Sequence, residues 1–212
     1  MSVMPLKSSV RSFPFGVQIL LMSHAIFWMA ANFLIPFLSI FFINELKGVT
    51  VTEIGISSLI FFLAFGLLEP VVGFLADRID GLNDEVTFLI FGYIARGLLF
   101  IMLAFATNVW HMYMFQFFLG VFRAIAGPGD KVLYASYVKG KPTATLWGLD
   151  ESITNISAAL GSGVGGYFVV AYGFRQMLIV AGVLTIVSAL VNFPLFKRSN
   201  KPRHRGLFGM FR

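Results

Sequence analysis

The sequence predicts an all-α integral membrane protein, built as one bundle of six transmembrane helices. The first observation is composition: of the 212 residues, 58% are hydrophobic and only 12% are charged, whereas a typical soluble domain carries about 25% charged residues. Too few polar residues remain to form the exterior of a soluble protein, so lipid is the expected solvent. The second observation is six mostly apolar stretches, each long enough to cross a bilayer core of about 30 Å.

Polar or turn residues separate the six stretches from one another. They cover residues 16–42, residues from the capping sequence Thr52-Glu53 to about 76, residues 85–106, 109–137, from Pro142 to about 172, and 175–196. Pro36, Pro70, Pro128 and Pro194 mark kinks or helix ends. The Gly-Pro-Gly sequence at 127–129 predicts either a hinge or the end of the fourth helix. The chain therefore divides into a cytoplasmic or interfacial segment (1–15), a transmembrane domain (16–196) and a basic tail (197–212).

The loop charges predict that both ends of the chain are cytoplasmic. Cytoplasmic loops of membrane proteins carry an excess of Lys and Arg. With the N-terminus inside, the cytoplasmic segments hold twelve such residues and the outer loops hold two, Lys47 and Arg175. The twelve are Lys7, Arg11, Arg78, Lys131, Lys139, Lys141, Lys197, Arg198, Lys201, Arg203, Arg205 and Arg212. This bias fits a plasma or inner membrane, where the tail also meets membrane lipid, and it explains the basic balance without a nucleic-acid partner.

Several kinds of chemistry are excluded or unsupported by the sequence. The chain has no Cys, which excludes disulfides, thiolate metal sites and cysteine nucleophiles. Its three His residues are too scattered for a metal site, and it contains neither a phosphate-binding loop nor a nucleophile elbow. We therefore expect no enzyme activity, no metal and no cofactor.

Residues 73–81, at the cytoplasmic end of the second helix, read GFLADRIDG. They resemble the signature of the major facilitator superfamily between its second and third helices. The resemblance implies a gating role for Gly73, Asp77, Arg78 and Gly81: glycine permits close helix approach, the aspartate faces a helix N-terminus and the arginine pairs with a carboxylate. The acidic residues that follow, Asp84 and Glu85, depart from the family pattern, which is basic there.

Two further segments resemble the same family. The fifth helix is dense in glycine, with Gly161, Gly165 and Gly166 on a packing face, and residues 172–175, YGFR, are similar to the family's turn between its fifth and sixth helices. The proline usual in the family's antiporter motif is absent. The family's members usually have twelve helices in two six-helix halves, so this chain resembles one half.

Ionisable residues at membrane depth are costly and therefore indicate function. We expect a buried polar network that lines the cytoplasmic part of a cavity, with Glu69 or Glu151 as the group that couples transport to protons. An equally supported alternative is that these residues only hold helices together. His24 and Asn32 of the first helix either line the cavity or bond neighbouring helices. The candidate residues are Glu69, Arg96, Arg123, Asp150, Glu151, Asn155, His24 and Asn32.

These features predict a half-size secondary transporter that moves a small solute by alternating access. Six helices supply one bundle, and a cavity between two rocking bundles needs a second. We therefore expect a parallel homodimer, or a heterodimer with another six-helix half. The alternatives are a membrane scaffold or assembly protein that transports nothing, and the N-terminal half of a split or truncated transporter. The sequence leaves the substrate open.

Overall fold

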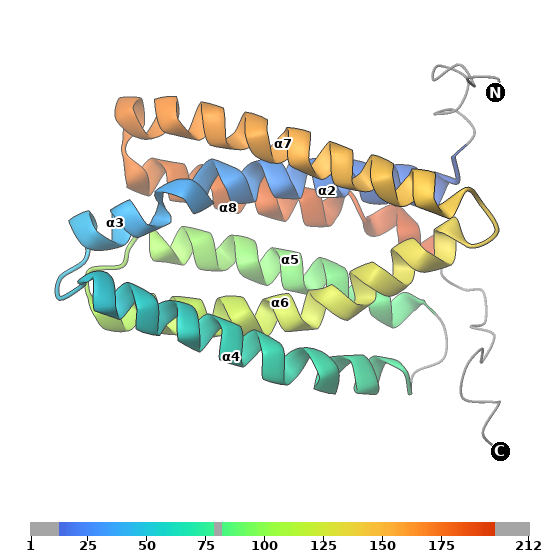
Figure 1. Cartoon of the computed structure of the whole chain (residues 1–212), viewed down its shortest axis with the longest axis horizontal. Coiled ribbons are helices and arrows are strands. Elements are labelled where there is room, and N and C mark those ends of the chain that lie inside the picture. Colours follow the sequence, from blue (N-terminus) through green and yellow to red (C-terminus); the bar gives the residue numbers. More distant parts are fainter. Residues whose placement is uncertain (1–12, 79–81, 198–212) are drawn as a thin grey trace.

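The computed structural model describes residues 13–78 and 82–197, and in these ranges the regular elements are all helices (Figure 1). They are α2 (Phe15–Leu34), η2 (Ile35–Phe37), α3 (Leu38–Glu45), α4 (Val51–Ala76), α5 (Asn83–Leu103), α6 (Val109–Val138), α7 (Thr143–Tyr172), α8 (Phe174–Leu190) and η3 (Phe193–Lys197). The predicted all-α class is confirmed. The N-terminal segment and the basic tail lie almost entirely outside the described residues.

Five helical spans are long and apolar enough to cross a membrane: Phe15–Glu45, Val51–Ala76, Asn83–Leu103, Thr143–Tyr172 and Phe174–Lys197. The remaining long helix, α6, has 30 residues and so the length to cross a bilayer. Its Arg123, Asp130 and Lys131 lower its hydropathy. The chain is thus an integral, multi-pass membrane protein whose fourth predicted helix is the most polar.

Local signals explain where the helices begin. Thr50 caps α4, because its hydroxyl accepts from the Thr52 amide at 3.2 Å while Glu53 accepts from the Thr50 amide at 2.9 Å. Asn108 caps α6 by accepting from the amides of the second and third residues of that helix. Asp84 and Glu85 stand in the first turn of α5, where negative charge is favourable. The acidic departure from the family motif is therefore a helix start.

Three prolines lie within helical segments. Pro36 stands in η2, which separates α2 from α3, whereas Pro70 and Pro128 lie inside α4 and α6. Of the two alternatives for Gly127–Gly129, a hinge or a helix end, the helix end is wrong, because α6 continues to Val138, next to the predicted end of the fourth stretch at 137. A membrane helix tolerates proline when its neighbours satisfy the freed backbone groups.

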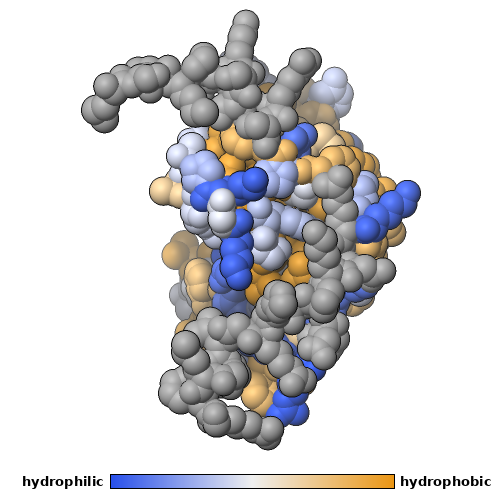
Figure 2. Space-filling model, turned by 90° about the vertical axis from the view of Figure 1, so that its right-hand side faces the viewer, coloured by the Kyte–Doolittle hydropathy of each residue, from blue (hydrophilic) through white to orange (hydrophobic). Residues whose placement is uncertain are grey.

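The helices form a bundle with α4 and α7 at its two edges (Figure 1). α4 packs chiefly on α6, and α7 packs chiefly on α2, while α5 contacts both α6 and α8. The described chain begins and ends at the same end of the bundle, which also carries the α4–α5 and α6–α7 connections. Figure 2 shows this end, where hydrophilic side chains gather. Its exposed cations include Arg78, Lys139, Lys141 and Lys197.

Glycines allow the closest helix contacts. A Cβ on Gly161 would collide with the carbonyl oxygen of Met29, and one on Gly165 with that of Phe33, so both glycines seat α7 against α2. Gly166 is less constrained, because its Cβ would meet the Phe37 ring at an ordinary 3.5 Å.

The α7–α8 turn depends on the conformation of one glycine. Gly173, in the segment that resembles the family turn, has a φ of 87°, which L side chains rarely adopt.

Candidate functional site

A cavity of about 190 Å³ lies among α2, α4, α5 and α6. Its lining combines aromatic rings with five charged side chains. The lining residues are Phe27, Trp28, Phe65, Glu69, Tyr93, Arg96, Arg123, Ala126, Gly127, Asp130 and Lys131. Three of the candidates named from the sequence, Glu69, Arg96 and Arg123, therefore line one cavity.

Glu69 and Lys131 form an ion pair at one wall of the cavity. The ammonium of Lys131 donates to Oε1 of Glu69 at 2.9 Å. Glycine at 127 makes room for this carboxylate, since a Cβ there would lie 3.0 Å from the same oxygen. Sequence analysis placed Lys131 in a cytoplasmic loop, but it lies within α6 and bridges α6 to α4.

The two arginines contact aromatic rings rather than carboxylates. The guanidinium of Arg96 lies 4.4 Å from the centroid of Phe27, and that of Arg123 lies 4.6 Å from the centroid of Phe65. The Nε of Arg96 is enclosed and has no hydrogen-bond partner among the described residues. Neither arginine has an ion pair there.

His24 bridges two carboxylates beside this cavity. Its Nδ1 lies 2.7 Å from Oδ1 of Asp150, and its Nε2 lies 2.8 Å from Oδ1 of Asp130. These contacts join α2 to α7 and to α6. His24 is 5% exposed and Asp150 is 9% exposed, so the bridge is largely shielded. His24 lies in the middle of α2, about two and a half turns after the helix begins.

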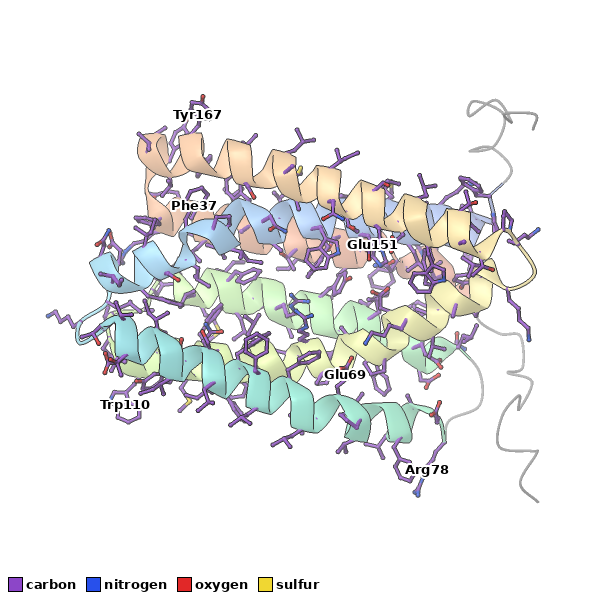
Figure 3. All side chains as sticks on the ribbon, viewed as in Figure 1. Phe37, Glu69, Arg78, Trp110, Glu151 and Tyr167 are labelled. Atoms are coloured by element: carbon purple, nitrogen blue, oxygen red, sulfur yellow. The ribbon has the colours of Figure 1, made fainter. Side chains whose placement is uncertain are left out.

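The other candidates from the fifth helix lie apart from this bridge. Glu151 is exposed, and Asn155 donates to its backbone carbonyl at 2.7 Å. Glu69 belongs to α4 and Glu151 to α7, the two edge helices of the bundle (Figure 3). Asn32 donates to the carbonyl of Trp28, one turn earlier in its own helix, at 3.0 Å. The expected network is therefore split, with His24 and Asp150 in one part and Glu69 in another.

The motif residues lie at the end of the bundle, away from the cavity. Asp77 follows α4 directly as its C-cap residue. The guanidinium of Arg78 lies 4.2 Å from the centroid of Phe74, and Figure 3 shows Arg78 pointing away from the bundle. A Cβ on Gly73 would meet no described atom within 4 Å, so no close helix contact within the described chain depends on this glycine. Gly81 lies outside the described residues.

Sequence reasoning missed Asp130 and Lys131 as site residues, although both are ionisable. Lys131 was counted among the cytoplasmic cations and Asp130 was not named as a site residue, although the predicted fourth stretch, 109–137, contains both. A helical spacing was present as a signal, because Asp130 follows Arg123 by seven residues, or about two turns. Considering the ionisable residues over the whole of this stretch would have included both charges.

Comparison with known proteins agrees with the motif resemblance. The family model of the Major Facilitator Superfamily matches residues 20–209. The membrane sensor protein UhpC of Escherichia coli is 24% identical over 156 residues, which cover 74% of this chain but only 34% of that protein. An uncharacterized MFS-type transporter of Methanocaldococcus jannaschii is 25% identical over 169 residues, or 78% of this chain and 41% of that protein.

One relative has a length similar to this chain. The uncharacterized MFS-type transporter YitZ of Bacillus subtilis is 24% identical over 164 residues, which cover 77% of this chain and 96% of that protein. Against UhpC, by contrast, the chain spans about a third of the relative's length. The family match, the helical bundle and the charged cavity agree, and the chain belongs to the Major Facilitator Superfamily of membrane transport proteins.

Proposed function

We propose that the protein is a half-size secondary transporter that moves a small solute through the cavity among α2, α4, α5 and α6 by alternating access. The cavity carries this proposal, because it brings five charged side chains together at membrane depth. Charges there are costly and are usually retained for function. Membership of a transporter family supports the same conclusion.

The proposal includes a second six-helix bundle, supplied by a copy of the chain or by another half. The two edge helices support this, because they are the least buried of the five apolar spans. In their most apolar stretches, 11% of α4 and 17% of α7 is buried, whereas the other three spans are 39–44% buried. The exposed cations at one end of the bundle favour a parallel pair, with its two-fold axis along the membrane normal. In that arrangement both termini of each chain lie in the cytoplasm, and Asp77 faces a helix of the other bundle.

Proton coupling, as part of this proposal, is assigned to His24 with Asp130 and Asp150, rather than to Glu69 or Glu151. Each of the two short nitrogen–oxygen contacts needs one proton between its atoms. The three groups must therefore share two protons. Loss of one proton would place a nitrogen lone pair against a carboxylate oxygen, which breaks one contact and frees α2 from either α6 or α7. Titration thus changes a helix contact.

The decisive experiment is transport by the purified chain in proteoliposomes, screened across small solutes with and without a pH gradient. We expect uptake of one solute class, with pH dependence that His24→Gln abolishes and that Glu69→Gln and Glu151→Gln retain. No uptake of any solute, from folded protein, would contradict transport. Uptake with unchanged pH dependence in His24→Gln would contradict the coupling site alone. Native mass spectrometry in mild detergent measures the oligomer: activity from a monomer would contradict the second bundle.

A second candidate function is ligand sensing without transport. The observation that favours it is the similarity to two proteins named membrane sensor protein UhpC. A sensor would bind a solute at the cavity and transport none of it. Measuring binding and uptake on the same preparation separates the two functions.

A further inference from the structure

We propose that Arg96 and Arg123 form a binding site for a small oxyanion, a carboxylate or a phosphate group, within the cavity. This inference rests on the proposed function and gives the chemical class of its solute. It comes from the charges of the lining. Three cations and two anions line the cavity, and both anions are already bound, Glu69 by Lys131 and Asp130 by His24. Among the residues that line the cavity, no carboxylate remains for the two arginines.

Arg96 has an enclosed donor that a bound anion would satisfy. Its Nε is enclosed and has no hydrogen-bond partner in the part of the chain that the structure describes, and its guanidinium lies over the ring of Phe27. An enclosed N–H donor without a partner is unfavourable, and the penalty is larger for a charged group. Arginine is also always protonated, so it cannot relieve the penalty by losing its charge. A ligand that accepts hydrogen bonds and carries negative charge satisfies both requirements.

The shape of the arginine side chain narrows the ligand class. Its planar fork of donors matches the two oxygens of a carboxylate or of a phosphate group. Arg123 stands on the adjacent helix α6 over Phe65, at the same cavity. Because the guanidinium of each arginine lies over an aromatic ring, each approaches the ligand from a fixed direction.

The volume and the walls indicate a small ligand with an apolar part. The cavity measures about 190 Å³, below the range of about 300–1,000 Å³ for drug-sized ligands. Phe27, Phe65 and Trp28 supply apolar surface beside the cations. The expected ligand is a small organic anion whose oxyanion group meets the arginines and whose body meets the rings.

Trp28 offers a direct readout of binding in detergent, without any transport step. The chain has three tryptophans, Trp28, Trp110 and Trp147. The double variant Trp110→Phe, Trp147→Phe leaves only the one at the cavity. Its fluorescence is titrated with sodium phosphate and with sodium acetate at constant ionic strength held by sodium chloride, and with acetamide as the neutral counterpart of acetate. We expect a saturable change with acetate, phosphate or both, and none with acetamide.

Arginine variants test the assignment. Arg96→Gln and Arg123→Gln should each weaken binding at least about tenfold, because hydrogen bonds to charged groups contribute about 1.5–3 kcal/mol. Arg96→Lys should bind with intermediate affinity, since it keeps the charge and loses the fork. Arg175→Gln is the matched control. This exposed arginine lies near Glu45, away from the cavity and at the end of the bundle opposite to the one where the described chain begins and ends, so its variant should bind the anion normally. Arg123 is exposed, so its variant remains informative if Arg96→Gln fails to fold.

Three results would overturn the anion site: no saturable change with either anion, unchanged affinity in both arginine-to-glutamine variants, or loss of the dimer in these variants with anion affinity retained. The last result would mean that a carboxylate from another chain pairs with the arginines. Failure of the proposed function gives a different pattern, in which the anion binds with arginine dependence but no solute enters proteoliposomes. Transport of an uncharged solute without anion binding would leave the function standing and remove this site.

Discussion

Two neighbouring carboxylates show how strongly the position on one helix decides the role of a residue. Asp150 and Glu151 point about 100° apart around α7. Asp150 contacts His24 and is 9% exposed, whereas Glu151 is exposed and accepts hydrogen bonds from Thr154 and Asn155 of its own helix. From the sequence, Glu69 or Glu151, and not Asp150, was expected to couple transport to protons. Which of the two faces inward depends on the rotation of α7 against α2, which no local pattern gives.

Asp150→Asn should destabilise the protein by about 1–3 kcal/mol, because it removes a charge from a shielded hydrogen bond to His24. Glu151→Gln, one residue away and exposed, should change stability by less than about 0.5 kcal/mol. Thermal unfolding of both variants in the same detergent, followed by circular dichroism, measures the difference. Equal midpoints for the two variants would mean that the His24–Asp150 contact contributes nothing to stability.

The Glu69–Lys131 pair allows a charge-exchange test. Lys131→Glu places two carboxylates opposite each other, and should lower stability by about 1 kcal/mol, a small value because the lysine side chain is 70% exposed. The double variant Glu69→Lys, Lys131→Glu restores an opposite pair and should recover most of that loss. Thermal unfolding of the two single variants and the double variant forms the cycle. Additive effects would contradict a direct contact between α4 and α6 at this point.

At the scale of helices, hydropathy and length predicted most of the fold. The site depended on contacts between residues far apart in the sequence, which local patterns do not predict. The apolar stretches located the helices, and the turn at Gly173 and the acidic start of α5 have local causes. The His24 bridge joins residues 106 and 126 positions apart, so only the packed bundle brings them together. The fourth stretch, predicted over 109–137, agrees with α6, and only the alternative that Gly127–Gly129 ends this helix is wrong, because a membrane helix tolerates proline.

The contact between α7 and α2 offers a matched test on a single helix. Gly161→Ala and Gly165→Ala each place a Cβ against a backbone carbonyl of α2, so α7 must move away, and we expect a loss of about 1–3 kcal/mol each. Gly163→Ala is the control, because its Cβ would meet no described atom within 4 Å. Alanine also favours a helix over glycine by about 0.5–1 kcal/mol, so this variant should be neutral or more stable. A similar loss in all three would show that glycine acts through backbone flexibility rather than through packing.

For the whole molecule, an even number of crossings places the beginning and the end of the bundle on the same side of the membrane. The distribution of Lys and Arg then indicates which side that is. The described chain begins and ends at one end of the bundle, together with the connections that carry Arg78, Lys139 and Lys141. The opposite end carries Lys47 and Arg175. Opposite ends of a membrane-spanning bundle face different compartments, and the end with more basic residues is expected in the cytoplasm. The predicted orientation therefore assigns individual residues to one side of the membrane, and chemical labelling can test this assignment.

Because the native chain has no cysteine, a single introduced cysteine is the only thiol and reports its own position. Lys141→Cys and Lys47→Cys replace exposed residues in connections at opposite ends. In intact cells a membrane-impermeant maleimide should label Lys47→Cys and leave Lys141→Cys unlabelled, and both should react after the membrane is permeabilised. Labelling of Lys141→Cys alone in intact cells would invert the orientation, and labelling of both would mean that the chain inserts in both orientations, which contradicts a parallel pair. The labelled position thus decides whether the basic end of this bundle faces the cytoplasm, and labelling of a single position shows the uniform orientation that parallel pairing requires.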